Sequence, residues 1–260
     1  MQLIMIEGLP GTGKTTIAEW LTDYLNTQGT NAILLLEGNR DIPCDFYEMA
    51  GIPNNDFEAL FIDNPETYKK LSNRALVTKN YSYLRIDDCP KNVAVKIKRW
   101  DMGDENNQMV TVSDYIPCTL ERLEHWVNKV ISNSGTVIVD SGFLQNPINE
   151  LLFRKATYKE TLLYISEIFQ RIKVLNPICI YLQRNNVDEA ISFAKEVKGK
   201  AWAERVDNLL IKNDCKDLFN IRFDLEQELL PLVEHIKCMP NGHDWLLVKK
   251  CIEDYFIKRV

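Results

Sequence analysis

The chain has 260 residues, of which 45% are hydrophobic and 26% are charged; this composition is that of a globular protein with a sizeable core and argues against intrinsic disorder. The net charge of −6 argues against a long polyanion such as DNA as the main partner. No run approaches the ~18 apolar residues of a membrane span, and Met1 directly precedes the first expected strand, so we expect a cytoplasmic protein without a membrane anchor.

The first distinctive feature is a glycine-rich segment near the start of the chain. Residues 8–15 fit the pattern G-x-x-x-x-G-K-[ST] of a phosphate-binding loop, also called Walker A. The preceding residues 3–6 are continuously apolar, as in a strand that is buried on both faces. Apolar residues then recur at helical spacing over 17–25, and Gly29 suits the position just past a helix end. The loop therefore has the strand and helix that the motif requires.

Each residue type in this loop has a physical reason. Glycines adopt backbone angles that turn successive N–H groups toward phosphate oxygens, and the following helix adds the positive end of its dipole. We expect Lys14 to reach the β- and γ-phosphates and the Thr15 hydroxyl to bind the Mg²⁺ that bridges them. The residues expected to contact the nucleotide, ATP, are Gly8, Gly11, Thr12, Gly13, Lys14, Thr15 and Thr16.

A second apolar run, residues 32–36, is followed by Glu37. In an open parallel sheet, ligands bind beyond the carboxyl ends of the strands, so Glu37 is expected to face the same crevice as the phosphate-binding loop. This carboxylate is a candidate for orienting or deprotonating a substrate hydroxyl. The alternative is a capping or solvated glutamate at the end of a strand.

The middle of the chain interrupts the alternation of strands and helices. Residues 41–53 are expected to form a loop with at most one helical turn, and 54–80 have a helical pattern. Residues 81–86 and 93–97 flank a turn and predict a β-hairpin. We interpret 54–116 as an insertion in a single domain that spans 1–260.

A third buried strand is expected at residues 136–139, after a helix over 118–132. This strand ends at Asp140, and an apolar run closed by an acid is the Walker B pattern, in which the acid binds the hydration shell of Mg²⁺. Glu37 is an alternative for the same role. Next, Asn146 fits the N-cap of a further helix and Pro147 its first position.

The remaining segments predict a helix over 158–174 and a buried strand over 178–182. Residues 184–205 are a candidate lid, in which Arg184 and Arg205 are candidate phosphate contacts because arginine binds oxyanions in a bidentate way. Since acidic residues are interspersed there, a solvated charged surface is the alternative. The final segments are expected to be a helix over 225–236, a short strand over 236–239 and a helix over 244–256.

Together these motifs resemble the P-loop kinases of small molecules, in particular the thymidylate kinase and deoxynucleoside kinase group. The resemblance rests on Ile6-Glu7-Gly8, Gly13-Lys14-Thr15-Thr16, Glu37, Val139-Asp140-Ser141 and Gln145-Asn146. In that group the acid after the second strand commonly acts as a base or substrate contact, and the acid of the third strand is followed by an arginine, where this chain has Ser141 and Gly142. The resemblance implies an α/β fold with a parallel sheet flanked by helices, and an ATP donor site.

The leading hypothesis is therefore an ATP- and Mg²⁺-dependent kinase of a small-molecule acceptor. The alternative is an ATP-hydrolysing switch or regulatory protein that acts through a protein partner. A GTPase is disfavoured because the chain has no N-K-x-D segment to recognise guanine, and a hexameric remodelling ATPase is disfavoured because Ser141 follows Asp140 where such motors carry a second acid. The acceptor and the oligomeric state stay open.

Overall fold

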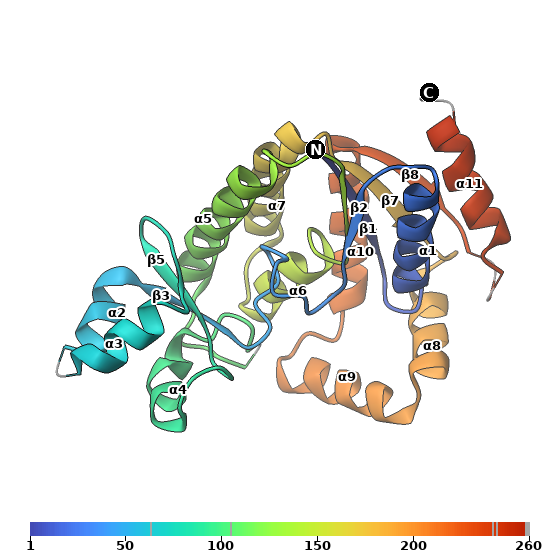
Figure 1. Cartoon of the computed structure of the whole chain (residues 1–260). Helices are drawn as coiled ribbons and strands as arrows, with labels where there is room; N and C mark the ends of the chain where they lie inside the picture. Colours follow the sequence, from blue (N-terminus) through green and yellow to red (C-terminus); the bar gives the residue numbers. More distant parts are fainter. Residues whose placement is uncertain (63, 105, 241, 243, 258–260) are drawn as a thin grey trace.

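Short apolar segments form a parallel sheet at the centre of the molecule. The computed structural model describes residues 1–62, 64–104, 106–240, 242 and 244–257. Within them, five parallel strands lie in the order β2-β6-β1-β7-β8 (Figure 1). These strands are β1 (Gln2–Gly8), β2 (Ala32–Leu35), β6 (Thr136–Asp140), β7 (Ile178–Leu182) and β8 (Glu234–Cys238). All five were expected from the sequence, and their ends differ from the expected ones by at most two residues.

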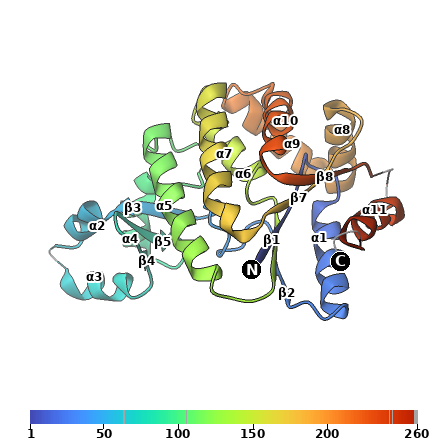
Figure 2. The same ribbon diagram turned by 90° about the horizontal axis from the view of Figure 1, so that it is seen from above.

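Helices cover both faces of this sheet. In β1, Leu3 and Met5 belong to the core beneath α5, α6, α7 and α10, whereas Ile4 and Ile6 belong to the core beneath α1 and α11. The two helical layers are seen on opposite sides of the sheet in Figures 1 and 2. These helices are α1 (Lys14–Thr27), α5 (Val112–Val130), α6 (Gln145–Phe153), α7 (Tyr158–Ile172), α10 (Leu218–Leu229) and α11 (Leu246–Ile257). Because both faces of the three central strands are buried, β6, β1 and β7 are mostly apolar instead of alternating.

Two of these helices begin earlier than expected. α5 begins at Val112 because Thr111 and Asp114 form a capping box ahead of it, and the helix continues through Pro117. α10 begins at Leu218 and ends at Leu229, so the helix expected over 225–236 was wrong in its bounds. Two short 3-10 helices, η2 (Lys173–Leu175) and η3 (Leu230–Leu232), follow α7 and α10, and a third, η1 (Lys98–Trp100), lies in the insertion. Among the described residues, no helix has the length and apolar character needed to cross a bilayer.

The insertion has a small antiparallel sheet of its own, at the left of Figure 1. Its strands lie in the order β3-β5-β4, with β3 (Met49–Pro53), β4 (Leu76–Val77) and β5 (Tyr81–Arg85). Its helices are α2 (Asn54–Leu60), α3 (Pro65–Ser72) and α4 (Lys91–Ile97). The loop expected over 41–53 was therefore wrong at its end, where β3 begins.

The β-hairpin expected around residues 87–92 was also wrong, because its second half is helix α4. Val93 and Ile97 are buried in the insertion core, whereas Val95 between them is 77% exposed. A spacing of four residues between buried positions is helical, and the alternation with polar residues that indicated a strand also fits this spacing. β5 pairs instead with β3 and β4.

Two further helices follow β7 and lie beyond the end of the sheet where β1 ends (Figure 1). They are α8 (Val187–Lys198), capped by the side chain of Asn186, and α9 (Lys200–Lys212), which has no buried residue. They include most of the segment 184–205 that was expected to form a lid.

Candidate active site

The glycine-rich segment forms a tight turn between β1 and α1. Gly8, Gly11 and Gly13 have φ angles of 139°, 77° and 87°, in the region that residues with a Cβ atom avoid. All three also lie too close to neighbours for a side chain: a Cβ at Gly8 would collide with the carbonyl oxygen of Leu182, one at Gly11 with the backbone of Ala194, and one at Gly13 with the indole ring of Trp245. The turn therefore requires glycine at each of these positions.

Lys14 is the first residue of α1 and lies against the turn. Its Nζ donates hydrogen bonds to the carbonyl oxygens of Gly8 (2.9 Å) and Leu9 (3.1 Å). Burial and the neighbouring Arg222 lower the pKa of the ammonium group, and the nearby carboxylates of Asp140, Glu37 and Glu7 oppose this effect. The lysine thus occupies the place expected from the motif, held by main-chain oxygens.

Thr15 and Asp140, the two expected metal ligands, meet directly. The Thr15 hydroxyl donates to Asp140 Oδ2 at 2.7 Å, and the Ser141 hydroxyl donates to Oδ1 at 2.8 Å. Asp140 ends β6 and is 1% exposed. A hydroxyl and a carboxylate are the oxygen ligands that Mg²⁺ prefers. Because the described residues contain no group of three metal-binding side chains, an ion at this position would take its other ligands from water and phosphate.

Glu37 lies in the turn after β2, where its carboxylate Oε1 accepts a hydrogen bond from Gln145 Nε2 at 2.8 Å. Its charge raises the pKa of Lys14. Glu37 also lines an open cleft of about 840 Å³ between the segment after β2, helix α6 and helix α9. The polar side chains of this cleft are Glu37, Asp45, Tyr47, Asn106, Asn146, Asn149, Glu150, Arg205, Asn208 and Lys212.

The two arginines expected to contact phosphate lie in different places. Arg184 follows β7 and is 4% exposed, and its Nη2 donates to the carbonyl oxygens of Gly11 (3.4 Å) and Gly242 (3.1 Å). Its guanidinium lies over the ring of Phe193, 3.6 Å from the centroid. Arg205 lies on α9 and lines the cleft instead. Of these two arginines, only Arg184 forms a hydrogen bond with the glycine-rich turn.

Glu7, which sequence analysis assigned no role, is buried beneath the turn. Its carboxylate accepts hydrogen bonds from the backbone N–H groups of Phe143 (2.8 Å), Leu144 (3.0 Å) and Gln145 (3.2 Å). It thereby satisfies the first N–H groups of α6, so the prediction of Asn146 as N-cap was wrong: the helix begins at Gln145. Burial raises the pKa of Glu7 to about 7, against the lowering effect of these three N–H groups.

A buried ion pair on α10 links this region together. Arg222 Nε donates to Glu226 Oε1 at 2.6 Å, and its Nη2 donates to the Gly8 carbonyl oxygen (2.7 Å) and to Gln145 Oε1 (3.1 Å). The Tyr181 hydroxyl donates to the other carboxylate oxygen of Glu226 at 2.6 Å. Because Arg222 binds the amide oxygen of Gln145, the amide nitrogen points to Glu37. The only sequence signal for this pair was an arginine and a glutamate four residues apart in an apolar helix.

Comparison with protein-family models and with curated proteins finds no match for this chain. Its own residues therefore carry any functional conclusion. They bring together Lys14, Thr15 and Asp140 at the end of β1, with Glu37 and a large cleft beside them.

Proposed function

We propose that the protein is a kinase with a P-loop kinase fold, which transfers the γ-phosphoryl group of ATP to a small-molecule acceptor. The observation that carries this proposal is the hydrogen bond between Thr15 and Asp140, because it joins the two oxygen ligands of a phosphate-bound Mg²⁺ at the end of a glycine-rich turn. Further support comes from the position of the turn at the carboxyl end of β1, the central strand, because open α/β sheets bind their ligands beyond the carboxyl ends of their strands.

On the donor side, the N–H groups of the turn and Lys14 bind the phosphates, and Lys14 exchanges its carbonyl partners for phosphate oxygens. Thr15 and Asp140 would hold Mg²⁺, and the ion would supply positive charge beside the phosphates. Arg184 adds a positive charge beside Gly11. These groups stabilise the charge that develops on the transferred phosphoryl group.

On the acceptor side, the substrate lies in the cleft between the segment after β2, helix α6 and helix α9, and Glu37 accepts the proton of its hydroxyl group. Gln145 holds the carboxylate of Glu37 in place and is itself held by Arg222. The amide side chains of Asn146 and the other asparagines of the cleft suit an acceptor that is rich in hydroxyl groups. Arg205 on α9 approaches the acceptor from the opposite wall.

The test is Mg²⁺-dependent release of ADP from ATP, in the presence of pooled nucleosides, nucleotides, sugars or amino alcohols. We expect one pool to stimulate the wild-type protein. Lys14→Ala should lower this turnover at least ~100-fold, as loss of a charged transition-state contact does, and the exposed control Lys173→Ala should leave it unchanged. A fully active Lys14→Ala protein would overturn the proposal.

A second variant separates transfer from simple hydrolysis. Glu37→Gln should lower the acceptor-stimulated rate ~100-fold or more while the affinity for ATP stays unchanged, because this side chain acts on the acceptor. Slow ATP hydrolysis that no pool stimulates, and that Glu37→Gln does not alter, would favour a switch protein over a kinase.

A further inference from the structure

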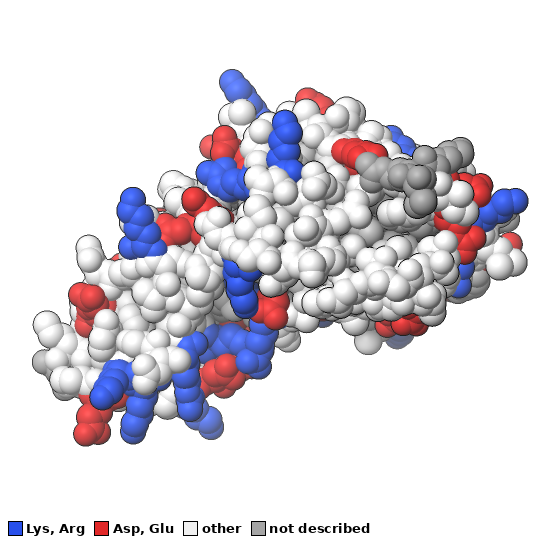
Figure 3. Space-filling view, turned by 45° about the horizontal axis from the view of Figure 1, so that its top comes forward, with Lys and Arg blue, Asp and Glu red and all other residues white. Residues whose placement is uncertain are grey.

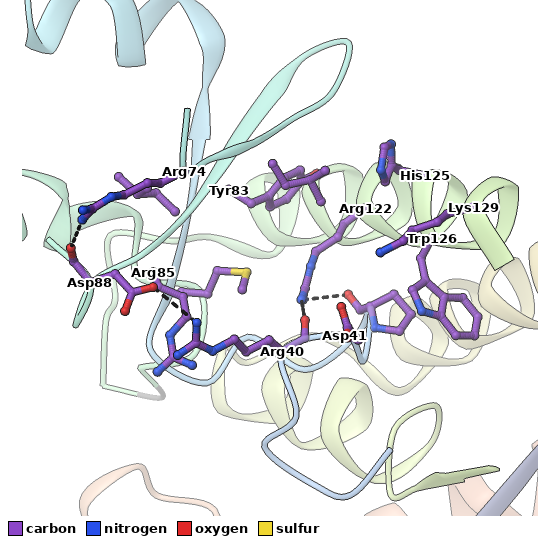
Figure 4. A pocket seen from close by; sticks show the side chains of 14 residues that line it. Arg40, Asp41, Arg74, Tyr83, Arg85, Asp88, Arg122, His125, Trp126 and Lys129 are labelled. Carbon is purple, nitrogen blue, oxygen red and sulfur yellow. Dashed lines mark hydrogen bonds and ion pairs between the residues drawn. The ribbon is translucent and has the colours of Figure 1, made fainter. Parts of the chain in front are cut away.

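The segment that follows Glu37 lines a second hollow besides the cleft. This cavity of about 260 Å³ lies between α5 and the sheet of the insertion, and Figure 4 shows the side chains around it. Gly38, Asp45 and Tyr47 line the cleft, whereas Arg40 and Asp41 line the cavity. The cavity is therefore separate from the site proposed for phosphoryl transfer.

Positive side chains dominate the cavity, although the whole chain has a net charge of −6. Its basic lining residues are Arg40, Arg74, Arg85, Arg122, His125 and Lys129. Only two acids, Asp41 and Asp88, line it as well. The basic residues come from four separate parts of the chain, namely the turns after β2 and α3, strand β5 and helix α5. Figure 3 shows Lys and Arg gathered along one edge of the insertion, with Asp and Glu between them.

Arg122 is the buried member of this group, with 4% of its surface exposed. Its guanidinium donates to the main-chain oxygens of Arg40 (2.6 Å), Pro43 (3.1 Å) and Asp45 (2.6 Å). Among the described residues, none of its hydrogen bonds goes to a carboxylate, so its charge is solvated by neutral dipoles and is not cancelled. A buried charge of this kind raises the positive potential of the cavity beside it.

The other basic residues differ in how far they are neutralised. Arg85 forms ion pairs with Asp87 and with Glu48 (3.5 Å). Arg40 forms an ion pair with Asp88 at 3.4 Å, and both side chains are exposed. Arg74 donates to the main-chain oxygen of Asp88 at 3.2 Å, which leaves its charge uncancelled. Lys129 makes no hydrogen bond or ion pair with another described residue, and it extends toward Arg122 in Figure 4. Cations from opposite walls thus face one space.

The rest of the wall is apolar and aromatic. Tyr83 and Trp126 line the cavity and are 2% and 7% exposed, and Met49 and Leu84 lie beside them. Tyr83 is fixed by a hydrogen bond from its hydroxyl to the Cys118 carbonyl oxygen at 2.7 Å. A ligand that complements this wall has an anionic head and a flat apolar body.

We propose that this cavity binds a small organic phosphate, with its phosphate among the arginines and its ring against Trp126 and Tyr83. A phosphate fits better than a carboxylate because it brings two charges and three acceptor oxygens to several cations that lie on different walls. Arginine in particular binds such groups with two parallel hydrogen bonds. This site does not depend on the proposed kinase activity.

The test is a calorimetric titration with phenyl phosphate as the probe. We expect one site on the wild-type chain, weaker binding of inorganic phosphate, and none of benzyl alcohol. Arg74→Ala/Lys129→Ala should weaken binding of phenyl phosphate at least ~10-fold, since two charged contacts are lost. Both side chains are exposed, so this variant should remain folded.

Two controls locate the binding. The variant Arg171→Ala/Lys173→Ala removes the same charge from a surface that does not line the cavity and should bind as the wild type does. Lys14→Ala should also bind phenyl phosphate normally. Binding that is lost in Lys14→Ala but kept in Arg74→Ala/Lys129→Ala would place the probe at the glycine-rich turn and overturn the proposal. Absence of binding, or equally tight binding of benzoate, would overturn it too.

Discussion

Two ion pairs in different regions of this molecule differ in burial. At the end of the parallel sheet, the side chains of Arg222 and Glu226 are 1% and 0% exposed. Beside the insertion, the side chains of Arg40 and Asp88 are 60% and 44% exposed. A buried pair has lost its hydration and depends on every remaining partner, whereas an exposed pair is solvated and screened. Removing the arginine should therefore lower the free energy of unfolding much more for the buried pair than for the exposed pair.

The largest effect is expected for the buried pair. Arg222→Met leaves Glu226 as an uncompensated buried charge and should lower the free energy of unfolding by about 3–5 kcal/mol. Arg40→Met should lower it by less than about 1 kcal/mol, because the Arg40 side chain is mostly solvated. Urea denaturation at neutral pH measures both. Equal losses in the two variants would contradict the comparison.

The backbone offers a second contrast, between two glycines of the proposed active site. Gly8 and Gly38 both have positive φ, of 139° and 81°, but a Cβ at Gly8 would collide with the Leu182 carbonyl oxygen, whereas one at Gly38 would meet nothing within 4 Å. Gly8→Ala should therefore cost about 3 kcal/mol from strain and overpacking together. Gly38→Ala should cost about 1 kcal/mol from strain alone.

Thermal or urea unfolding of the two alanine variants provides this measurement. The difference between them isolates the close approach of β1 and β7, because both variants carry the cost of a positive φ. A Gly38→Ala protein that is as unstable as Gly8→Ala would show that the contact with Leu182 contributes nothing.

Titration is expected to change stability with opposite signs at Glu7 and at Asp87. Burial raises the pKa of Glu7 from 4.5 to about 7, so the folded state binds the extra proton and this group makes stability fall as the pH rises from 4.5 to about 7. The slope is at most ~1.4 kcal/mol per pH unit for one proton. In Glu7→Gln this fall should be absent.

Asp87 in the insertion is expected to show the opposite dependence of stability on pH from that of Glu7. A hydrogen bond from Arg85 lowers the pKa of Asp87 below its ordinary 3.8, so its contribution to stability is present above pH 3.8 and is lost as the pH falls through the lowered value. Because Asp87 is exposed, this contribution is small. Stability curves from pH 3 to 8 for wild type, Glu7→Gln and Asp87→Asn test both signs. Identical curves for all three proteins would refute the assignments.

The sequence predicted the parts of the molecule that depend on local pattern. Four strands of the parallel sheet were found because each contains a short apolar run, and the turn around Gly13 because its glycines and Lys14 are close together in the chain. Thr15 and Asp140 were assigned to the same ion from the Walker A and Walker B patterns, and the structure places their side chains in contact.

The features that were predicted wrongly or missed depend on contacts between residues that are far apart in the sequence. Asn146 was a reasonable N-cap by type, but the N–H groups of α6 are taken by Glu7, which lies far earlier in the chain. The role of Arg222 depends likewise on Gly8, 214 positions away. In the insertion, the residues around Val95 fit a strand and a helix equally well, and only packing against the insertion core decides between them.

The place of β1 in the sheet has a consequence for how the chain folds. β1 lies between β6 and β7, and its Gln2 pairs with Thr136 and its Ile4 with Ile178. A ribosome that adds roughly 5–20 residues per second needs about ten seconds to make the chain from β1 to β6. During this time β1 has neither neighbour, and the closure of such long loops makes folding slow. The strand that carries the glycine-rich turn therefore stays unpaired, and open to aggregation, until at least β6 has been made.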